Sequence, residues 1–84
     1  MKKGTKINGN VKSLGLCGHT RIDDFIYAVK SDGKGLYCIV PHTKDKDGGI
    51  YLFDSEFEVK NFDNVHLEIF LKISSKWISL THLV

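Results

Sequence analysis

Residues 65–73 read VHLEIFLKI and carry the clearest hydrophobic pattern in the chain. Apolar side chains stand at every second position, namely Val65, Leu67, Ile69, Leu71 and Ile73. Because the side chains of an extended strand alternate between its two faces, this period of two would place all five on one face. A helix would scatter the same five around its circumference. The stretch therefore predicts a β-strand with one buried face.

The segment before it, residues 50–59, shows a similar alternation. One face would carry the aromatic and apolar residues Tyr51, Phe53, Phe57 and Val59. The other would carry Leu52 and three acids, Asp54, Glu56 and Glu58. Residues 61–64 then supply turn chemistry, with an asparagine at each end. Residues 50–59 and 65–73 are thus predicted to form a hairpin or a meander pair.

A second hairpin is predicted from the apolar runs at residues 22–30 and 36–42, which flank the turn dipeptide Asp32-Gly33. Pro41 is expected to end the second strand or to lie at its edge, because proline cannot donate to a β-ladder. The polar residues 43–49 follow as a loop.

The two ends of the chain leave alternatives open. Residues 5–7 and 11–16 are predicted to be short strands about a turn at residues 8–10, which read Asn-Gly-Asn. Residues 77–84 are expected to form a strand paired back on residues 65–73. A helix is the alternative there, because Trp77, Leu80 and Leu83 recur at a spacing of three, but β-branched residues between them favour the strand.

Together these segments predict an all-β fold of six to seven strands. The expected architecture is a small, mostly antiparallel meander, either barrel-like or a compact sandwich, with a short C-terminal helix as the alternative at the end. The 84 residues fit one domain, residues 1–84, and 42% hydrophobic with 26% charged residues is typical of a globular protein. So small a core leaves little room for a deep substrate cavity, which disfavours an enzyme.

The charge is unevenly distributed along the chain, although its net value is only +2. The first 21 residues contain no acid and five basic residues, Lys2, Lys3, Lys6, Lys12 and Arg21. The polar residues that follow Lys3 argue against a secretory signal, and no apolar run reaches the roughly 20 residues of a membrane span. We therefore expect a cytoplasmic protein whose two cysteines are reduced.

The residues whose types best match a metal site are Cys17, His19, Cys38 and His42. Zinc favours tetrahedral sites of two cysteines and two histidines, and a structural metal would stabilise a small core. The spacings C-x-H and C-x₃-H are not those of usual zinc knuckles, and Cys38 stands in an apolar run that predicts burial. No cofactor is therefore expected, with a zinc-stabilised domain kept as an alternative.

The same residues also resemble, in type alone, a nucleophilic cysteine–histidine pair with Asp23 or Asp24 orienting the histidine. No local motif supports an oxyanion hole. The chain is therefore predicted not to be an enzyme.

The leading functional prediction is a non-enzymatic module that docks another protein, as an inhibitor or accessory factor, through a sheet face or edge. Its contact candidates are the acids Asp54, Glu56 and Glu58, together with Phe70. A solvent-facing acidic strand is the simpler explanation of the three carboxylates. Phe70 would be an aromatic ring on a polar strand face, and it needs cover from the Trp77 region or from a partner. A free edge could also pair with a second copy, giving a homo-oligomer.

Nucleic-acid binding is the alternative function. Lys2, Lys3, Lys6, Lys12 and Arg21 would contact phosphates in a small barrel, with tyrosines as stacking platforms. The basic residues are few and the tyrosines lie within apolar runs, where packing explains them equally well.

Overall fold

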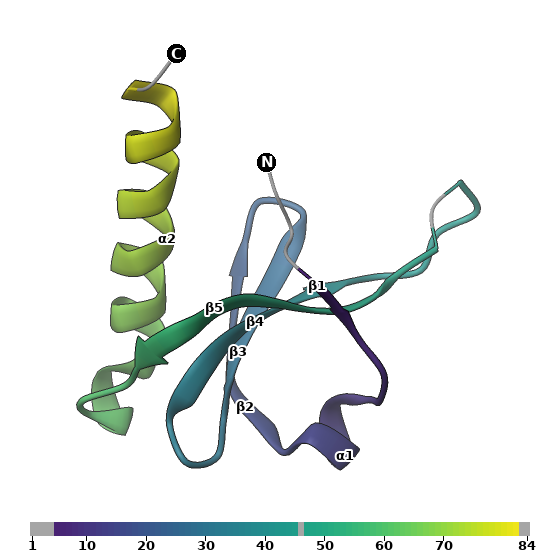
Figure 1. The fold of residues 1–84 in the computed structure, drawn as a ribbon, viewed down its shortest axis with the longest axis horizontal. Helices are drawn as coiled ribbons and strands as arrows, with labels where there is room; N and C mark the ends of the chain where they lie inside the picture. The colour runs from purple at the N-terminus through teal and green to yellow at the C-terminus, as the bar shows by residue number, and fades with distance from the viewer. Residues whose placement is uncertain (1–4, 46, 83–84) are drawn as a thin grey trace.

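The computed structural model describes the backbone of residues 5–45 and 47–82, and the side chains as far as Ser75 apart from residue 46. Within these residues five strands form one antiparallel sheet in the order β1-β5-β4-β3-β2 (Figure 1). The strands are β1 (Thr5–Ile7), β2 (Leu16–Ile22), β3 (Phe25–Lys30), β4 (Lys34–Val40) and β5 (Gly49–Glu58). The helical elements are α1 (Val11–Leu14), the 3-10 turn η1 (Phe62–Asn64) and α2 (Val65–His82).

The sheet is open, so the prediction of a barrel or sandwich with six to seven strands is wrong. Strands β2 to β5 form an antiparallel meander, as expected for the sheet as a whole, but β2 itself was not predicted as a strand, and β1 is added beside β5. β1 and β2 are therefore the two edges, and they do not pair with each other. The strand number is lower because three segments predicted as strands, residues 11–16, 65–73 and 77–84, are wholly or mostly helical where the structure describes them.

Residues 65–73 form the first half of α2, which corrects the strand prediction. Val65, Ile69 and Ile73 are buried against the sheet, whereas Leu67 and Leu71 are 55% and 57% exposed. The five alternating residues thus lie on different sides of their segment. The physical reason is that a period of two also places an apolar residue at every fourth position, which is the spacing of a helix face.

The C-terminal strand over residues 77–84 is also wrong as far as His82, where α2 ends. The helix alternative is correct for these residues, and the helix continues unbroken from Val65. Residues 83 and 84 lie outside the described residues.

The N-terminal segment forms the predicted strand at Thr5–Ile7, but its pairing differs from the prediction. β1 pairs with β5, so that Lys6 lies opposite Tyr51. Residues 11–14 form α1 instead of a strand because the asparagine and serine at its start cap a helix. The Asn10 side chain accepts the N–H of Ser13 at 2.7 Å, and the Ser13 hydroxyl accepts the N–H of Asn10 at 2.9 Å.

The hairpin predicted around Asp32-Gly33 is confirmed as β3 and β4, with Val29 opposite Leu36. The boundaries shift slightly, because Ile22 belongs to β2 and β4 ends at Val40, just before Pro41. Gly33 has a φ of +78°, and the Asp32 carboxylate accepts the N–H of Lys34 at 2.9 Å. The strand predicted over residues 50–59 is confirmed as β5.

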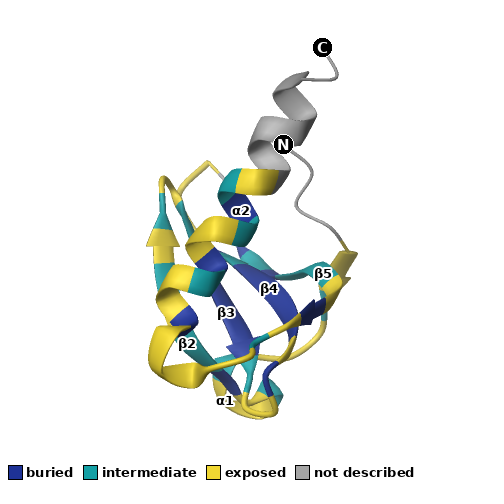
Figure 2. Cartoon of the chain, turned by 90° about the vertical axis from the view of Figure 1, so that its left-hand side faces the viewer, coloured by how far each residue is buried: buried dark blue, intermediate teal, exposed yellow. Residues whose placement is uncertain are grey.

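Apolar residues cover both faces of the sheet. The larger cluster lies between the sheet and α2, as Figure 2 shows for β3 and β4 behind the helix. Its buried members are Tyr27, Val29, Leu36, Cys38, Val40, Phe57, Val65, Ile69 and Ile73. A smaller cluster on the opposite face gathers Leu16, Ala28, Tyr37 and Ile50, with Val11 and Leu14 of α1 packed against it. The side of α2 that carries Val65, Ile69 and Ile73 packs on the sheet.

Candidate protein-binding surface

The side of α2 that faces away from the sheet is apolar. Leu67, Phe70 and Leu71 are 55%, 51% and 57% exposed. Their spacing of three and four residues makes them neighbours on one helix face. We call these three residues the α2 apolar face. Adjacent exposed apolar side chains of this size often mark an interaction site.

One flank of α2 is fixed on β2. Gly18 lets the helix approach closely, since a Cβ there would lie 2.9 Å from Cγ2 of Val65. One residue further along α2, Nδ1 of His66 lies 2.8 Å from the hydroxyl oxygen of Thr20. Phe70 follows His66 by one turn and so continues along this flank toward the outer side.

The other flank of α2 is fixed on β5 and on the chain that follows it. The Glu68 carboxylate accepts the backbone N–H groups of Lys60 and Asn61, each at 3.0 Å. Nζ of Lys72 lies 3.5 Å from a carboxylate oxygen of Asp54. Both charged residues of helix positions 65–75 therefore have partners on this flank, and the α2 apolar face between the flanks is uncharged.

Asp54 does not share the surroundings of Glu56 and Glu58, although the alternation predicts one face for all three. An irregularity in the β4–β5 register places Leu52 opposite Tyr37 but Asp54 opposite Leu36, which belongs to the α2 side of the sheet. The Asp54 side chain is only 11% exposed. One of its oxygens also accepts the N–H of Glu56 at 3.0 Å.

Glu56 and Glu58 are exposed and flank Phe57, which is buried under α2. Alternation along β5 therefore directs these two acids away from α2. Phe70 lies on the outer side of the helix, so the structure does not bring the four predicted contact residues together. Its suggested cover, Trp77, belongs to the part of α2 whose side chains are not described.

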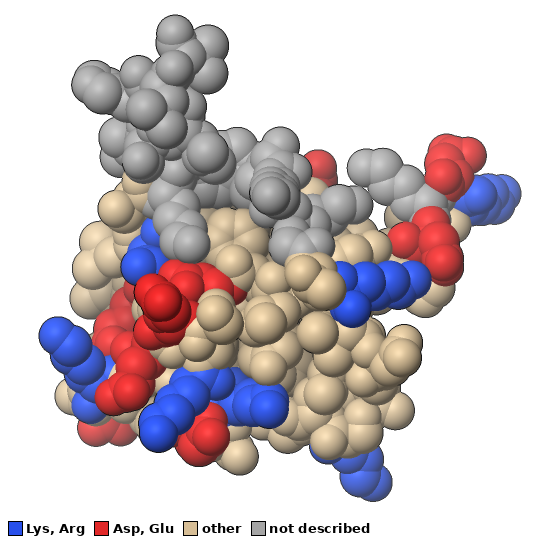
Figure 3. Space-filling model, viewed as in Figure 1, with Lys and Arg blue, Asp and Glu red and all other residues tan. Residues whose placement is uncertain are grey.

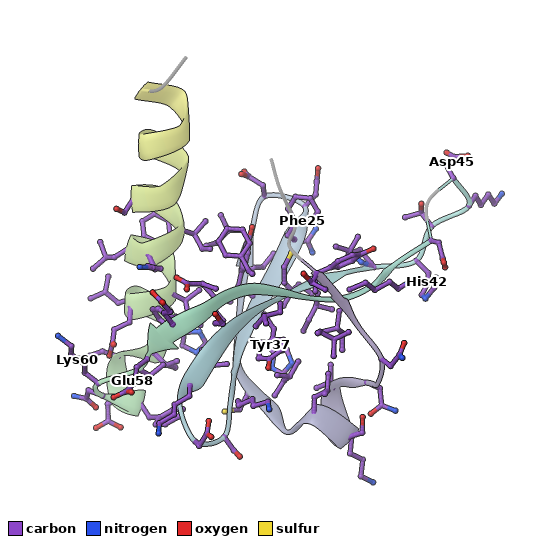
Figure 4. The ribbon with its side chains drawn as sticks, viewed as in Figure 1. Phe25, Tyr37, His42, Asp45, Glu58 and Lys60 are labelled. Carbon is purple, nitrogen blue, oxygen red and sulfur yellow. The ribbon has the colours of Figure 1, made fainter. Side chains whose placement is uncertain are left out.

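The four residues considered as zinc ligands are also dispersed. Cys17 is half-buried and His19 exposed on β2, whereas Cys38 is buried on β4, with β3 lying between the two strands. His42 lies beyond β4 on the loop that projects away from α2 (Figures 1 and 4). Its Nδ1 is 3.1 Å from Asp47 and 3.1 Å from the backbone nitrogen of Gly48. Within residues 5–45 and 47–82 no three potential ligands gather into a metal site.

The cysteine–histidine pair considered for nucleophilic chemistry gains no support from these positions. Cys38 is fully buried in the core beneath α2. Cys17 lies near the start of β2, while Asp23 and Asp24 are exposed in the turn beyond its other end.

The basic residues considered for nucleic-acid binding do not share one surface. Lys6 lies on the edge strand β1, within 3.7 Å of Asp47, and Arg21 lies on the opposite edge strand β2. Lys12 is exposed on α1, and Lys2 and Lys3 lie outside the described residues. Figure 3 shows basic and acidic groups interspersed over the face in view.

Leu67 and Leu71 are the surface residues that the sequence analysis missed, because it assigned them to the buried face of a strand. A helical period was the available signal. With 100° per residue, positions 67 and 71 fall opposite positions 65, 69 and 73, and position 70 falls between the two sides, on the flank that carries His66.

Comparison with known proteins gives no relative from which to transfer a function. No family model, curated protein or solved structure matches the chain. Among the described residues no helix is both long and apolar enough to cross a bilayer. Cys17 and Cys38 do not form a disulfide with each other.

Proposed function

We propose that this chain is a small non-enzymatic protein-binding module that docks its partner through the α2 apolar face. The observation that carries the proposal is the exposure of Leu67, Phe70 and Leu71, about half of each side chain, side by side on one helix. Removing such apolar surface from water is the main driving force of protein association. A helix face with this spacing is a common form of recognition surface.

The anchoring of α2 supports this proposal. Contacts on both flanks, from His66 to Thr20 and from Lys72 to Asp54, hold the described first half of the helix in one orientation. A surface that is already ordered loses little conformational entropy on binding, so more of the apolar contact contributes to affinity.

We further propose that the module acts in the cytoplasm as an inhibitor or accessory factor. The placement of Cys17 on β2 and Cys38 on β4, without a disulfide between them, supports a reducing compartment. The docking surface that we propose lies on α2, whereas the sequence predicted a sheet face or edge. Of the four predicted contact residues, only Phe70 belongs to the α2 apolar face.

A photo-crosslinking amino acid at position 71 tests the proposal in the cells that make the protein. We expect a discrete light-dependent adduct from position 71, on the α2 apolar face. The same crosslinker at position 56, exposed on the other side of β5, is the matched control and should give none. Equal labelling from both positions, or no adduct from position 71, would contradict the proposal.

A further inference from the structure

We infer that the occupant of the α2 apolar face is a second copy of this chain, which packs its own α2 antiparallel to the first in a two-fold dimer. This inference rests on the proposed function and names the partner for the same surface. A two-fold dimer uses one patch on both copies, so the patch must be complementary to itself.

The α2 apolar face meets this condition through its lack of charge. Glu68 is engaged with the backbone of Lys60 and Asn61, and Lys72 with Asp54, all on the β5 flank. Two copies can therefore bring Leu67, Phe70 and Leu71 together without burying either of these charged groups. A strongly basic or acidic partner would find no opposite charge on this face, and burial of its own charge would be unfavourable.

The distribution of charge at the start of α2 favours the antiparallel orientation. Asp63 in η1 and Glu68 in the first turn both lie at the N-terminal end. A parallel pair would place these acids and their copies at the same end of the dimer, and it would also align the two helix dipoles. The antiparallel pair separates the acids and opposes the dipoles, and both changes lower the electrostatic energy.

The spacing of residues along α2 is compatible with an antiparallel pair of helices. If the two-fold axis passes between Phe70 and Leu71, Phe70 faces Leu71 of the second copy and Leu67 faces its Ser74. Ser74 is small and half-buried, so it leaves room for the leucine. Positions 67, 70, 71 and 74 also have the three-and-four spacing of helices that pack knobs into holes.

The size of the face sets the expected strength. Three half-exposed side chains leave on the order of 300 Å² of apolar surface per copy, hence roughly 600 Å² for the pair, which is below the 1,200 Å² of a standard stable interface. We therefore expect a weak dimer with a dissociation constant of roughly 100 µM.

Sedimentation velocity over about 10 µM to 1 mM tests whether the dimer forms. We expect the wild-type chain to shift from monomer toward dimer, and Leu71→Glu to weaken association at least about tenfold. Ser55→Glu adds the same charge at an exposed position of β5 and should dimerise like the wild type. Circular dichroism establishes that both variants are folded. A wild-type chain that stays monomeric at the highest concentration would overturn the inference.

Disulfide trapping tests the orientation, in a Cys17→Ser background. An antiparallel pair places position 67 level with position 74 of the second copy, whereas positions 67 and 67 are about 10 Å apart along the axis. We expect a mixture of the Leu67→Cys and Ser74→Cys chains to form more disulfide between the two variants than Leu67→Cys forms with a second copy of itself. The reason is that a disulfide tolerates Cα separations of only about 7 Å. The reverse order would overturn the antiparallel arrangement.

The photo-crosslink distinguishes failure of this inference from failure of the proposed function. An adduct of twice the chain mass supports the second copy. An adduct of another mass from position 71, with a monomeric chain in sedimentation, overturns the dimer and leaves the protein-binding function supported.

Discussion

Gly18 on β2 controls how closely α2 approaches the sheet. A Cβ at this position would meet Val65 at 2.9 Å, and the φ of +68° is unfavourable for any side chain. We expect Gly18→Ala to lower the free energy of unfolding by about 2–4 kcal/mol, measured by urea denaturation. Gly15→Ala is the matched control, because φ is +65° there but the nearest atom is 3.7 Å away. Equal losses in the two variants would show that the contact with Val65 contributes nothing.

Asp54 is the residue whose position the alternation of β5 does not predict. Two of its interactions can be distinguished by substitution, since one oxygen accepts the N–H of Glu56 and the other faces Lys72. Asp54→Ala removes both, and we expect a loss of about 1–3 kcal/mol, largely independent of salt. Lys72→Gln removes only the partly exposed ion pair and should cost at most about 1 kcal/mol, decreasing at high salt. Denaturation midpoints at low and high salt measure both, and a larger loss for Lys72→Gln would contradict the assignment.

At the scale of elements, the alternating stretch at residues 65–73 is compatible with either a strand or a helix. An alternation of apolar residues also makes every fourth residue apolar, and among the α2 side chains that the structure describes the core takes Val65, Ile69 and Ile73. Elements with local signals were predictable, as the β3–β4 hairpin about Asp32-Gly33 shows. The helix was not, because its apolar residues outnumber those that one helix face needs. The missed surface residues Leu67 and Leu71 follow from this single error.

Two substitutions within the same alternation distinguish helix from strand. Ile69 is fully buried and Leu71 is 57% exposed. We expect Ile69→Ala to lower the free energy of unfolding by about 2–4 kcal/mol and Leu71→Ala by less than about 0.5 kcal/mol, measured by chemical denaturation at low protein concentration. A strand with one buried face would lose similar stability at both positions, so comparable values would contradict α2.

At the scale of the whole molecule, the pairing that sequence could not supply is the long-range one between β1 and β5. The Asn-Gly-Asn turn at residues 8–10 favours a local hairpin, but the cap formed by Asn10 and Ser13 directs the chain into α1 instead. β1 is then free to pair with Ile50 to Leu52, more than 40 residues away in sequence. Contacts of this kind depend on the assembled sheet, and no local pattern of side chains marks them.

The dimer inferred through α2 predicts that the stability of the whole molecule depends on its concentration. Association of folded chains stabilises them by mass action, whereas the unfolded chain has no α2 apolar face to bind. With a dissociation constant of about 100 µM, raising the concentration to about 1 mM adds roughly 1 kcal/mol, which corresponds to a Tm increase of several degrees for a domain of this size. The Tm of Leu71→Glu should be the same at all concentrations in that range, while the Tm of Ser55→Glu should rise with concentration as in the wild type. A wild-type Tm that stays constant in scanning calorimetry would mean that folded chains do not meet through this helix.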